Sequence, residues 1–406
     1  MPIRVVLGAQ WEGQISRHSC APSSTLRQSR RKPNTFYAVV YENTKTRRQG
    51  GHNAGHSIVA NGVPYSMNFI GSDVPSFFSE LKQLDEKGLP NVYDRILVSD
   101  RVHINFDLHA AVDGLEEVEL GADLTVNGPS YSTKAARSGI RLADVFDQEL
   151  FETKLRRLAH GYKARYGDLL KYDVEEEIGR FRGYRTELAK YAIDGLSFMH
   201  SAQTSNMNVI IEGANAVMLD ISMGSYPYVT SSNTTISGII AGLTLNPKNI
   251  TETIGVVKAW SERNSRRLAE NGEHPQAEDV AVAGSVCQHL ALFSISKLAV
   301  TYSDFIDLVV LDVLDSFETI KIAIAYKDKS TGKELDSYPA AHNILDEAEV
   351  VYHEMPGWMK PTTNVRTYYD LPKQAQDYVE YIEKFVGVKV KWIGTGADRE
   401  AMITRD

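Results

Sequence analysis

Residues 208–235 read NVIIEGANAVMLDISMGSYPYVTSSNTT and carry the strongest indication of the fold. Asn208 to Glu212 is a short, mostly apolar run that ends at Gly213, which is typical of a strand buried inside a parallel sheet. A run of amide, carboxylate and hydroxyl side chains follows this strand. Ligands of open α/β sheets bind beyond the carboxyl ends of the strands, so the stretch predicts a strand that leads into a binding loop. The structural alternative is a hydroxyl-rich loop that caps the next helix.

The rest of the chain alternates between strand and helix patterns. Strands are expected at residues 3–7, 91–98, 102–106, 308–314, 320–325 and 388–393. Helices are expected at residues 74–87, 148–166 and 174–199. This alternation predicts an α/β fold with a large, twisted, mostly parallel sheet flanked by helices.

Composition excludes several classes of protein. The chain has 406 residues with 44 Lys and Arg against 52 Asp and Glu, a net charge of −8, and this disfavours a nucleic-acid-binding face. The two cysteines, Cys20 and Cys287, form no disulfide framework or zinc motif. We find no apolar run long enough to span a bilayer and no signal-peptide cleavage site, so we expect a cytoplasmic protein with no membrane partner.

Two segments do not match the α/β pattern of the rest. Residues 12–46 begin with a polar, basic, aperiodic run, and residues 261–307 begin with a charged run that gives way to small residues. We expect a single domain over residues 1–406 in which these two segments are atypical.

Two strings before residue 208 could bind an anionic ligand. In residues 47–59, RRQGGHNAGHSIV, glycines permit close backbone approach, and Asn53 and His56 could face a ligand. In residues 128–146, GPSYSTKAARSGIRLADVF, Arg137 could hold a phosphate through both arms of its guanidinium group. The structural alternatives are a glycine-rich turn with a surface histidine and a solvated helix face.

Two later strings each follow an apolar strand. In residues 309–320, VVLDVLDSFETI, the carboxylate of Asp312 could accept hydrogen bonds from N1 and N2 of guanine. In residues 392–402, WIGTGADREAM, backbone groups after the strand could line a base or phosphate site. The alternatives are a structural Asp312 with a helix cap at Asp315, and an ordinary turn.

Together, in this order and spacing, these strings resemble the adenylosuccinate synthetase family. The motifs that carry the resemblance are NAGH, YSTKAARSGIR, the EGAN…LDI…YPYVTSSN block and WIGTG, with support from PGWMKPTT at residues 356–363. The resemblance covers residues 1–11, about 47–258 and about 308–406. It implies the family's P-loop-NTPase-like fold and a homodimeric ligase that joins IMP and L-aspartate, with GTP as co-substrate and Mg²⁺ as cofactor, in AMP biosynthesis.

The mechanism implied by the resemblance has three steps. A base removes the N1 proton of IMP, O6 attacks the γ-phosphate of GTP, and the amine of aspartate displaces phosphate from 6-phosphoryl-IMP. By matching position, His56 is the general acid, the carbonyl of Gly55 is a Mg²⁺ ligand, and Asp312 reads guanine. The residues implied to bind IMP are Asn53, Ala54, Gly55, His56, Asn215, Thr230 and, from the neighbouring subunit, Arg137. The residues implied to close over the guanine are Gly394, Thr395 and Gly396.

The chain departs from the family at the places where phosphoryl transfer takes place. The family reads GAQWGDEGKGK after its first strand, whereas this chain reads GAQWEGQIS, so the glycine cradle, catalytic aspartate and phosphate lysine are missing. Glu12 is the nearest remnant, and Thr125 is a loose candidate for a threonine lost from a shortened loop. Val310 occupies the position of a family lysine, and Ser222 occupies the position of a family aspartate. The family's aspartate-binding loops are absent from residues 261–307.

Two readings of activity follow from these departures. The chain is either a ligase of the family, with atypical segments that reflect a misread frame or splice site, or a non-catalytic purine-nucleotide-binding or dimerising relative. Because positioning and electrostatics supply nearly all phosphoryl-transfer catalysis, we expect the sequence as written to have little ligase activity.

Overall fold

The structure is a computed structural model, and it describes most of the chain. The described residues are 3–8, 35–39, 56–60, 63–67, 74–86, 88, 92–120, 128–205, 208–213, 217–224, 226, 229–259, 303–309, 311–336, 339–341, 344, 347–396 and 401–405.

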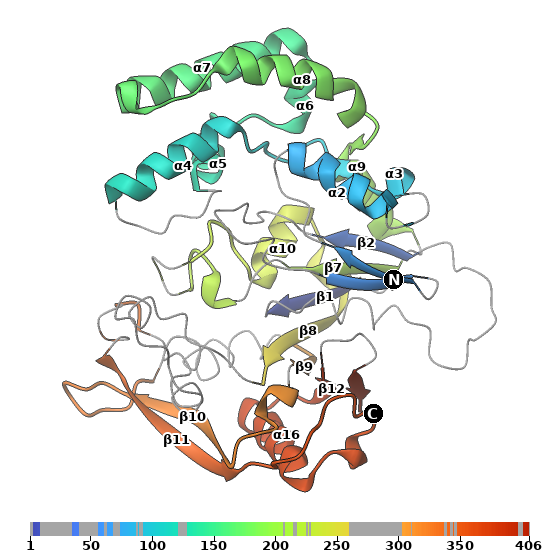
Figure 1. Cartoon of the computed structure of the whole chain (residues 1–406), viewed down its shortest axis with the longest axis vertical. Helices are drawn as coiled ribbons and strands as arrows, with labels where there is room; N and C mark the ends of the chain where they lie inside the picture. The colour runs from blue at the N-terminus through green and yellow to red at the C-terminus, as the bar shows by residue number, and fades with distance from the viewer. Residues whose placement is uncertain are drawn as a thin grey trace.

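A twisted sheet forms the centre of the molecule (Figure 1). Within the described residues it has seven strands, in the order β13-β12-β9-β8-β1-β7-β2. These strands are β1 (Ile3–Gly8), β2 (Thr35–Val39), β7 (Asn208–Glu212), β8 (Ile250–Lys258), β9 (Phe305–Val309), β12 (Val390–Gly394) and β13 (Met402–Thr404). Neighbouring strands are parallel except at the edge, where β13 runs antiparallel to β12. The predicted α/β fold with a mostly parallel sheet is confirmed.

Strand β1 is buried on both faces, which explains its continuous apolar sequence. Ile3, Val5 and Val6 have no exposed surface. Helices α9 (Gly195–Thr204) and α10 (Ile236–Leu243) contribute side chains to the cluster around Ile3 and Val5. Helix α16 (Lys373–Val386) packs with the apolar side chains of β9 and β12. Burial on both faces of a parallel sheet is what the sequence pattern predicted.

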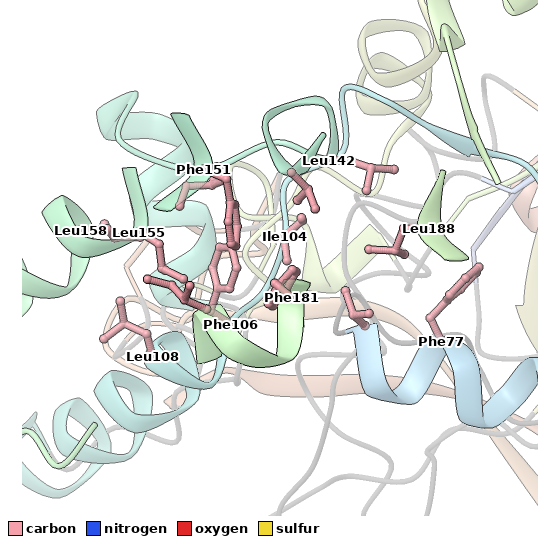
Figure 2. Close-up of a cluster of buried hydrophobic side chains, with 14 of the residues drawn as sticks. Phe77, Ile104, Phe106, Leu108, Leu142, Phe151, Leu155, Leu158, Phe181 and Leu188 are labelled. Carbon is pink, nitrogen blue, oxygen red and sulfur yellow. The ribbon is translucent and has the colours of Figure 1, made fainter. Parts of the chain in front are cut away.

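A helical region lies beside the sheet at the top of Figure 1. Its helices are α2 (Val74–Glu86), α4 (Asp107–Leu120), α5 (Gly128–Ala136), α6 (Leu142–Val145), α7 (Gln148–Tyr166) and α8 (Val174–Leu188). All of these helices except α5 contribute to one apolar cluster, in which the ring of Phe106 lies 6.1 Å from that of Phe151 and 5.2 Å from that of Phe181 (Figure 2). Helix α7 has the bounds predicted from its periodicity.

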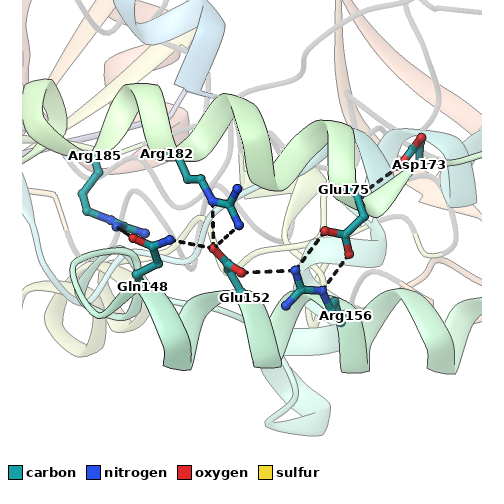
Figure 3. A network of polar contacts seen from close by, with 7 residues as sticks. All are labelled: Gln148, Glu152, Arg156, Asp173, Glu175, Arg182 and Arg185. Carbon is teal, nitrogen blue, oxygen red and sulfur yellow. Dashed lines mark hydrogen bonds and ion pairs between the residues drawn. The ribbon is translucent and has the colours of Figure 1, made fainter.

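A network of charged side chains joins α7 to α8 (Figure 3). Glu152 accepts hydrogen bonds from Arg182 Nε at 2.9 Å and Arg156 Nη2 at 3.1 Å. The guanidinium group of Arg156 also donates to both oxygens of Glu175, at 2.7 and 2.9 Å. Because two arginines share one carboxylate, the network fixes the relative rotation of the two helices more firmly than an isolated surface pair could.

Three small sheets and several short helices complete the described residues. The small sheets pair β3 (His56–Ala60) with β4 (Val63–Met67), β5 (Val98–Ser99) with β6 (Ala192–Ile193), and β10 (Thr319–Lys327) with β11 (Glu349–Pro356). The short helices are α3 (Val92–Arg95), η1 (Gly167–Leu169), η2 (Val217–Leu219), η3 (Pro247–Asn249), η5 (Leu311–Leu314) and η6 (Tyr368–Asp370).

Two of the strand predictions before residue 110 are wrong. Residues 92–95 form α3, and only Val98 and Ser99 form a strand there. Residues 102–106 make a single bridge, from His103 to Arg141. Helix α4 begins at Asp107, and the backbone N–H of Phe106 donates to His109 Nδ1 at 3.1 Å, which ends any extended pairing.

Two other predictions fail at element boundaries. The helix expected at residues 174–199 is broken, because Asp194 caps a new helix by accepting from the N–H groups of Leu196 and Ser197. Gly195 is needed at this break, since a Cβ there would lie 2.2 Å from Ser99 Oγ. The strand expected at residues 308–314 ends at Val309 and gives way to η5.

The two atypical segments contain parts of the sheet. Strand β2 lies within residues 12–46, and the first residues of β9 lie within residues 261–307. The rest of both segments lies outside the described residues, apart from Ser303 and Asp304. In the part of the chain that the structure describes, no helix is long and apolar enough to cross a membrane.

Asp307 provides a test of the sheet's packing. It is fully buried on β9, and its carboxylate has no hydrogen-bond partner within the part of the chain that the structure describes. Burial raises the pKa of Asp307 from 3.8 to about 7. The folded state therefore binds a proton that the unfolded state has lost above pH 4, so stability falls as the pH rises toward and through 7.

We predict that Asp307→Asn is more stable than the wild type and that the difference grows by roughly 2–3 kcal/mol between pH 5 and pH 8. Urea unfolding at the two pH values measures it. The control is the same substitution at an exposed aspartate, Asp370→Asn. A stability difference independent of pH would show that Asp307 does not titrate with a raised pKa.

Candidate functional site

The carboxyl ends of the parallel strands lie at one edge of the sheet. Strand β7 ends beside β1, and the backbone N–H of Gly213 donates to the carbonyl of Val6 at 2.9 Å. A Cβ on Gly213 would lie 3.3 Å from this carbonyl oxygen and 3.1 Å from Ile239 Cδ1. The glycine after the strand is therefore required by close packing, and the chain turns here into the polar loop that the sequence predicted.

The carboxylate of Asp220 organises this loop. Asp220 has no exposed surface and accepts hydrogen bonds from the backbone N–H groups of Ser222 at 2.8 Å, Met223 at 3.1 Å and Thr234 at 2.7 Å. The side-chain amide of Asn233 donates to it at 3.2 Å. Asp220 thus holds the two ends of the loop together and serves the backbone rather than a ligand.

Thr230 lies on the inner side of the loop. Its backbone N–H donates to the carbonyl of Leu219 at 2.8 Å, and the residue is 5% exposed. Ser231 has a buried hydroxyl with no hydrogen-bond partner in the structure. Helix α10 follows with Thr235 as its N-cap, and no side chain caps it. The structural alternative, a loop whose hydroxyls cap this helix, is therefore not what is observed at Thr235.

We predict that Asp220→Ala lowers the free energy of unfolding by about 3 kcal/mol, because three backbone N–H groups, one of them on the buried Thr234, lose their acceptor. Urea denaturation measures this loss. Asp173→Ala is the matched control: Asp173 caps α8 from an exposed position, and its loss should cost about 1 kcal/mol. Equal losses in the two variants would mean that Asp220 does not organise the loop.

Arg137 follows the last turn of α5 in a left-handed conformation, with φ of 63°. Its backbone N–H donates to the carbonyl of Lys134, and those of Ser138 and Gly139 both donate to Thr133. The Arg137 side chain is exposed, and it has no hydrogen-bond or ion-pair partner among the residues that the structure describes. The guanidinium group is therefore available to bind a ligand or a partner chain.

Asp312 and the end of β12 lie together at the other side of the sheet edge, because η5 packs against β12. Asp312 Oδ1 is buried without a hydrogen-bond partner among the described residues, and burial raises the pKa of the carboxyl group above its usual value. An acceptor in this state is suited to a donor that arrives with a ligand. At the end of β12, Thr395 is fully buried and donates from its N–H to the carbonyl of Ala401 at 2.8 Å.

The turn after β12 is held closely from one side. Thr395 Oγ1 donates to the carbonyl of Val365 at 2.9 Å. A Cβ on Gly396 would lie 3.1 Å from Ala401 Cβ. Gly394 is the last residue of β12. The structure therefore brings Gly394, Thr395 and Gly396 next to the turn that carries Asp312.

The catalytic side of the site is described only in part. His56 is the first residue of β3 and pairs with Met67 across the hairpin, but its side chain is outside the described residues. The other predicted residues that lie outside the described residues are Glu12, Asn53, Ala54, Gly55, Thr125, Asn215 and Val310.

No group of three or more His, Cys, Asp or Glu side chains among the described residues could hold a metal ion. Since Gly55 lies outside them, the described residues supply no set of magnesium ligands.

Sequence inspection missed the role of Asp315. A helix cap was the alternative at this position, but the carboxylate instead accepts a hydrogen bond from Trp358 Nε1 at 2.8 Å. It also accepts from the N–H of Thr362 at 2.7 Å. Both partners of Asp315 lie in the PGWMKPTT string at residues 356–363. Its tryptophan and threonines were the available signal in the sequence that this string could donate hydrogen bonds to a carboxylate.

Comparison with known proteins is consistent across most of the chain. The family model of adenylosuccinate synthetase matches residues 40–270 and 290–403. The chain is 52% identical to the adenylosuccinate synthetase of Fusarium vanettenii over 443 aligned positions, which cover 100% of both chains. It is 53% identical to that of Neurospora crassa over 400 positions, which cover 88% of this chain and 91% of the relative.

A solved structure agrees with the sequence relatives. Fully ligated adenylosuccinate synthetase from Plasmodium falciparum superimposes with a TM-score of 0.79 at 28% identity, over 100% of both chains. The alignment with the Fusarium vanettenii relative has 443 positions against the 406 residues of this chain, so it contains gaps on this side. The family model leaves residues 1–39 and 271–289 unmatched, which lie mostly in the two atypical segments.

Proposed function

The chain belongs to the adenylosuccinate synthetase family, the ligases that join IMP and L-aspartate at the expense of GTP, and on this premise we propose which residues bind each substrate. Asp312 accepts hydrogen bonds from N1–H and N2–H of guanine, and Gly394, Thr395 and Gly396 close over the base. The observation that supports this assignment best is the buried, unpartnered oxygen of Asp312 beside the turn after β12. Guanine offers N1–H and N2–H as donors to this oxygen, whereas adenine has an acceptor at N1.

IMP binds at the loop after β7 and at the NAGH string. Thr230 and Asn215 contact the nucleotide, and Asn53, Ala54, Gly55 and His56 also bind it. The rigid Asp220 loop supports this proposal for Thr230, because a residue that orients a ligand must itself be held in place. The other five positions rest on the family's motif pattern in the sequence.

His56 acts as general acid toward the phosphate groups, protonating charge that develops as the γ-phosphoryl group moves to O6 of IMP. Mg²⁺ accompanies GTP, with the carbonyl of Gly55 as one ligand. The ion supplies charge neutralisation on the phosphate oxygens when bound. Glu12 is the nearest acidic residue to the position of the family's catalytic base in the sequence.

Arg137 binds the phosphate of IMP in the neighbouring subunit of a homodimer. Its exposed, unpaired guanidinium group within the described residues supports this proposal, since a phosphate accepts both of its arms. Arg137→Ala is therefore expected to weaken IMP binding about tenfold or more while leaving GDP binding unchanged.

Calorimetric titration with each nucleotide measures this effect. Lys190→Ala is the control, because Lys190 is an exposed cation already paired with Glu187 at 2.7 Å. Unchanged IMP affinity in Arg137→Ala, or equal losses for IMP and GDP, would contradict the assignment.

Activity itself is tested by restoring the missing loop. We predict that placing GDEGKGK after Trp11, in place of residues 12–18, in a chain that also carries the family's aspartate-binding loops within residues 261–307, raises the rate of adenylosuccinate formation by several orders of magnitude over the same chain without GDEGKGK, because this loop positions the transferring phosphoryl group. His56→Ala in the restored chain should remove most of the gain. Product formation from IMP, GTP, Mg²⁺ and aspartate is followed by chromatography.

Two results of this assay distinguish the readings of the sequence. Product above the His56→Ala background identifies a ligase. Nucleotide binding without product in either form identifies the alternative, a non-catalytic, purine-nucleotide-binding relative. A rate in the chain as written that equals the rate of the restored chain would show that the loop is dispensable.

A further inference from the structure

Asp315 accepts three hydrogen bonds from one distant segment of the chain. Trp358 Nε1 donates at 2.8 Å and Thr362 Oγ1 at 2.7 Å to Oδ1, while the backbone N–H of Thr362 donates at 2.7 Å to Oδ2. Both donor residues are buried, with Trp358 3% and Thr362 0% exposed. Three donors on one carboxylate fix its position and orientation more tightly than any single bond does.

The same segment, residues 356–365, is docked at its start against the chain just after Asp315. The backbone N–H of Gly357 donates to the carbonyl of Glu318 at 2.7 Å. A Cβ on Gly357 would lie only 1.7 Å from the carbonyl oxygen of Phe317, so only glycine permits this approach. The segment therefore meets the turn that carries Asp312 at two separate points.

At its other end, residues 356–365 contact the turn after β12. The backbone N–H of Asn364 donates to the carbonyl of Thr395 at 3.1 Å, and Thr395 Oγ1 donates to the carbonyl of Val365 at 2.9 Å. Asn364 has a left-handed backbone, with φ of 64°, and its Oδ1 would lie 3.9 Å from a Cβ on Gly396. One segment thus bridges the Asp312 turn and the Thr395 turn.

We propose that Asp315 is the positioning residue for guanine selection, because it anchors the bridge that sets Asp312 relative to Gly394, Thr395 and Gly396. Among the described residues, no group hydrogen-bonds to Asp312 Oδ1, so the orientation of this oxygen depends on the backbone of the turn that carries Asp312. This inference rests on the proposed function, in which Asp312 reads guanine. Asp315 itself touches no nucleotide.

Asp315→Asn disrupts the three hydrogen bonds to residues 356–365 with little change in side-chain size. One oxygen of the carboxylate becomes an NH₂ donor that faces either the N–H of Thr362 or the donors from Trp358 and Thr362 Oγ1, so at least one buried donor loses its acceptor. The bridge then shifts relative to the Asp312 turn. The interaction most sensitive to this shift is the two-point contact with N1–H and N2–H of the base.

The experiment measures dissociation constants of the full-length chain for GDP, IDP and IMP by calorimetry at one salt concentration. IDP keeps N1–H and lacks the N2 amine. We expect wild-type protein to prefer GDP to IDP, and Asp315→Asn to weaken GDP binding about tenfold while IDP binding changes about two- to threefold. IMP binding should stay within about twofold of the wild type.

Asp328→Asn is the matched control. Asp328 also accepts three hydrogen bonds, from the N–H and hydroxyl groups of Ser330 and the N–H of Thr331, but it does so within an exposed turn after β10. Its substitution should leave the GDP-to-IDP ratio unchanged. If Asp315→Asn does not fold, Thr362→Val and Trp358→Phe each remove donors while keeping the Asp315 charge, and each should lower the same ratio.

Three outcomes overturn the inference. A lowered melting temperature with an unchanged GDP-to-IDP ratio assigns Asp315 to stability alone. Equal losses for GDP, IDP and IMP point to general unfolding of the site. A wild-type chain that does not prefer GDP to IDP overturns the reading of guanine by Asp312 as well, whereas a preference that survives in Asp315→Asn overturns only the positioning role.

Discussion

Parallel pairing of β1 with β7 on one side and β8 on the other is the constraint on which the site depends. Parallel strands cannot be joined by tight hairpins, so the chain must return across a face of the sheet between them, and the parallel strands all end at the same edge. At this edge the backbone N–H of Gly213, after β7, donates to the carbonyl of Val6 on β1 and holds the ends of the two strands together. Loops that lie far apart in the sequence, such as those after β7 and β12, therefore open on one side of the molecule.

Four aspartates that are buried or half-buried have different roles in this structure. The number of hydrogen-bond donors around each carboxylate distinguishes these roles. Asp220, which is buried, and Asp315, which is half-buried, each accept several hydrogen bonds from the protein, so their oxygens are satisfied internally and their role is to hold backbone in place. Asp312 leaves a buried oxygen without a donor beside a close-packed turn, which is the condition for ligand recognition. Asp307 is also unpartnered, but it lies in mid-strand with no exposed surface, so it reduces stability and offers nothing to a ligand.

The sequence predicted those parts whose determinants are local. Strands β1, β7 and β12 and helix α7 follow from apolar runs, periodicity and turn residues within a few positions. The breaks at Asp194 and after Val309 did not follow, because the helical periodicity and the apolar run continue past them; the close approach of Gly195 to Ser99 and the contact of η5 with β12 appear only in the folded chain. The same limit applies to the site. Asp312 stands out at the end of an apolar run, whereas the partners of Asp315 lie more than forty positions away in the chain.

Binding and catalysis depend on different parts of this chain. The described residues hold a guanine-side turn, an ordered loop at Thr230 and an exposed Arg137, all of which contact a nucleotide in its ground state under the proposed assignment. The sequence departs from the family's pattern after Trp11, where the family's loop holds the transferring phosphoryl group, and the family model leaves residues 271–289 unmatched. Groups that bind substrate and transition state equally well lower KM without raising kcat. Under the proposed assignment the first set contributes to nucleotide affinity, so affinity for GDP or IMP does not measure turnover in this chain.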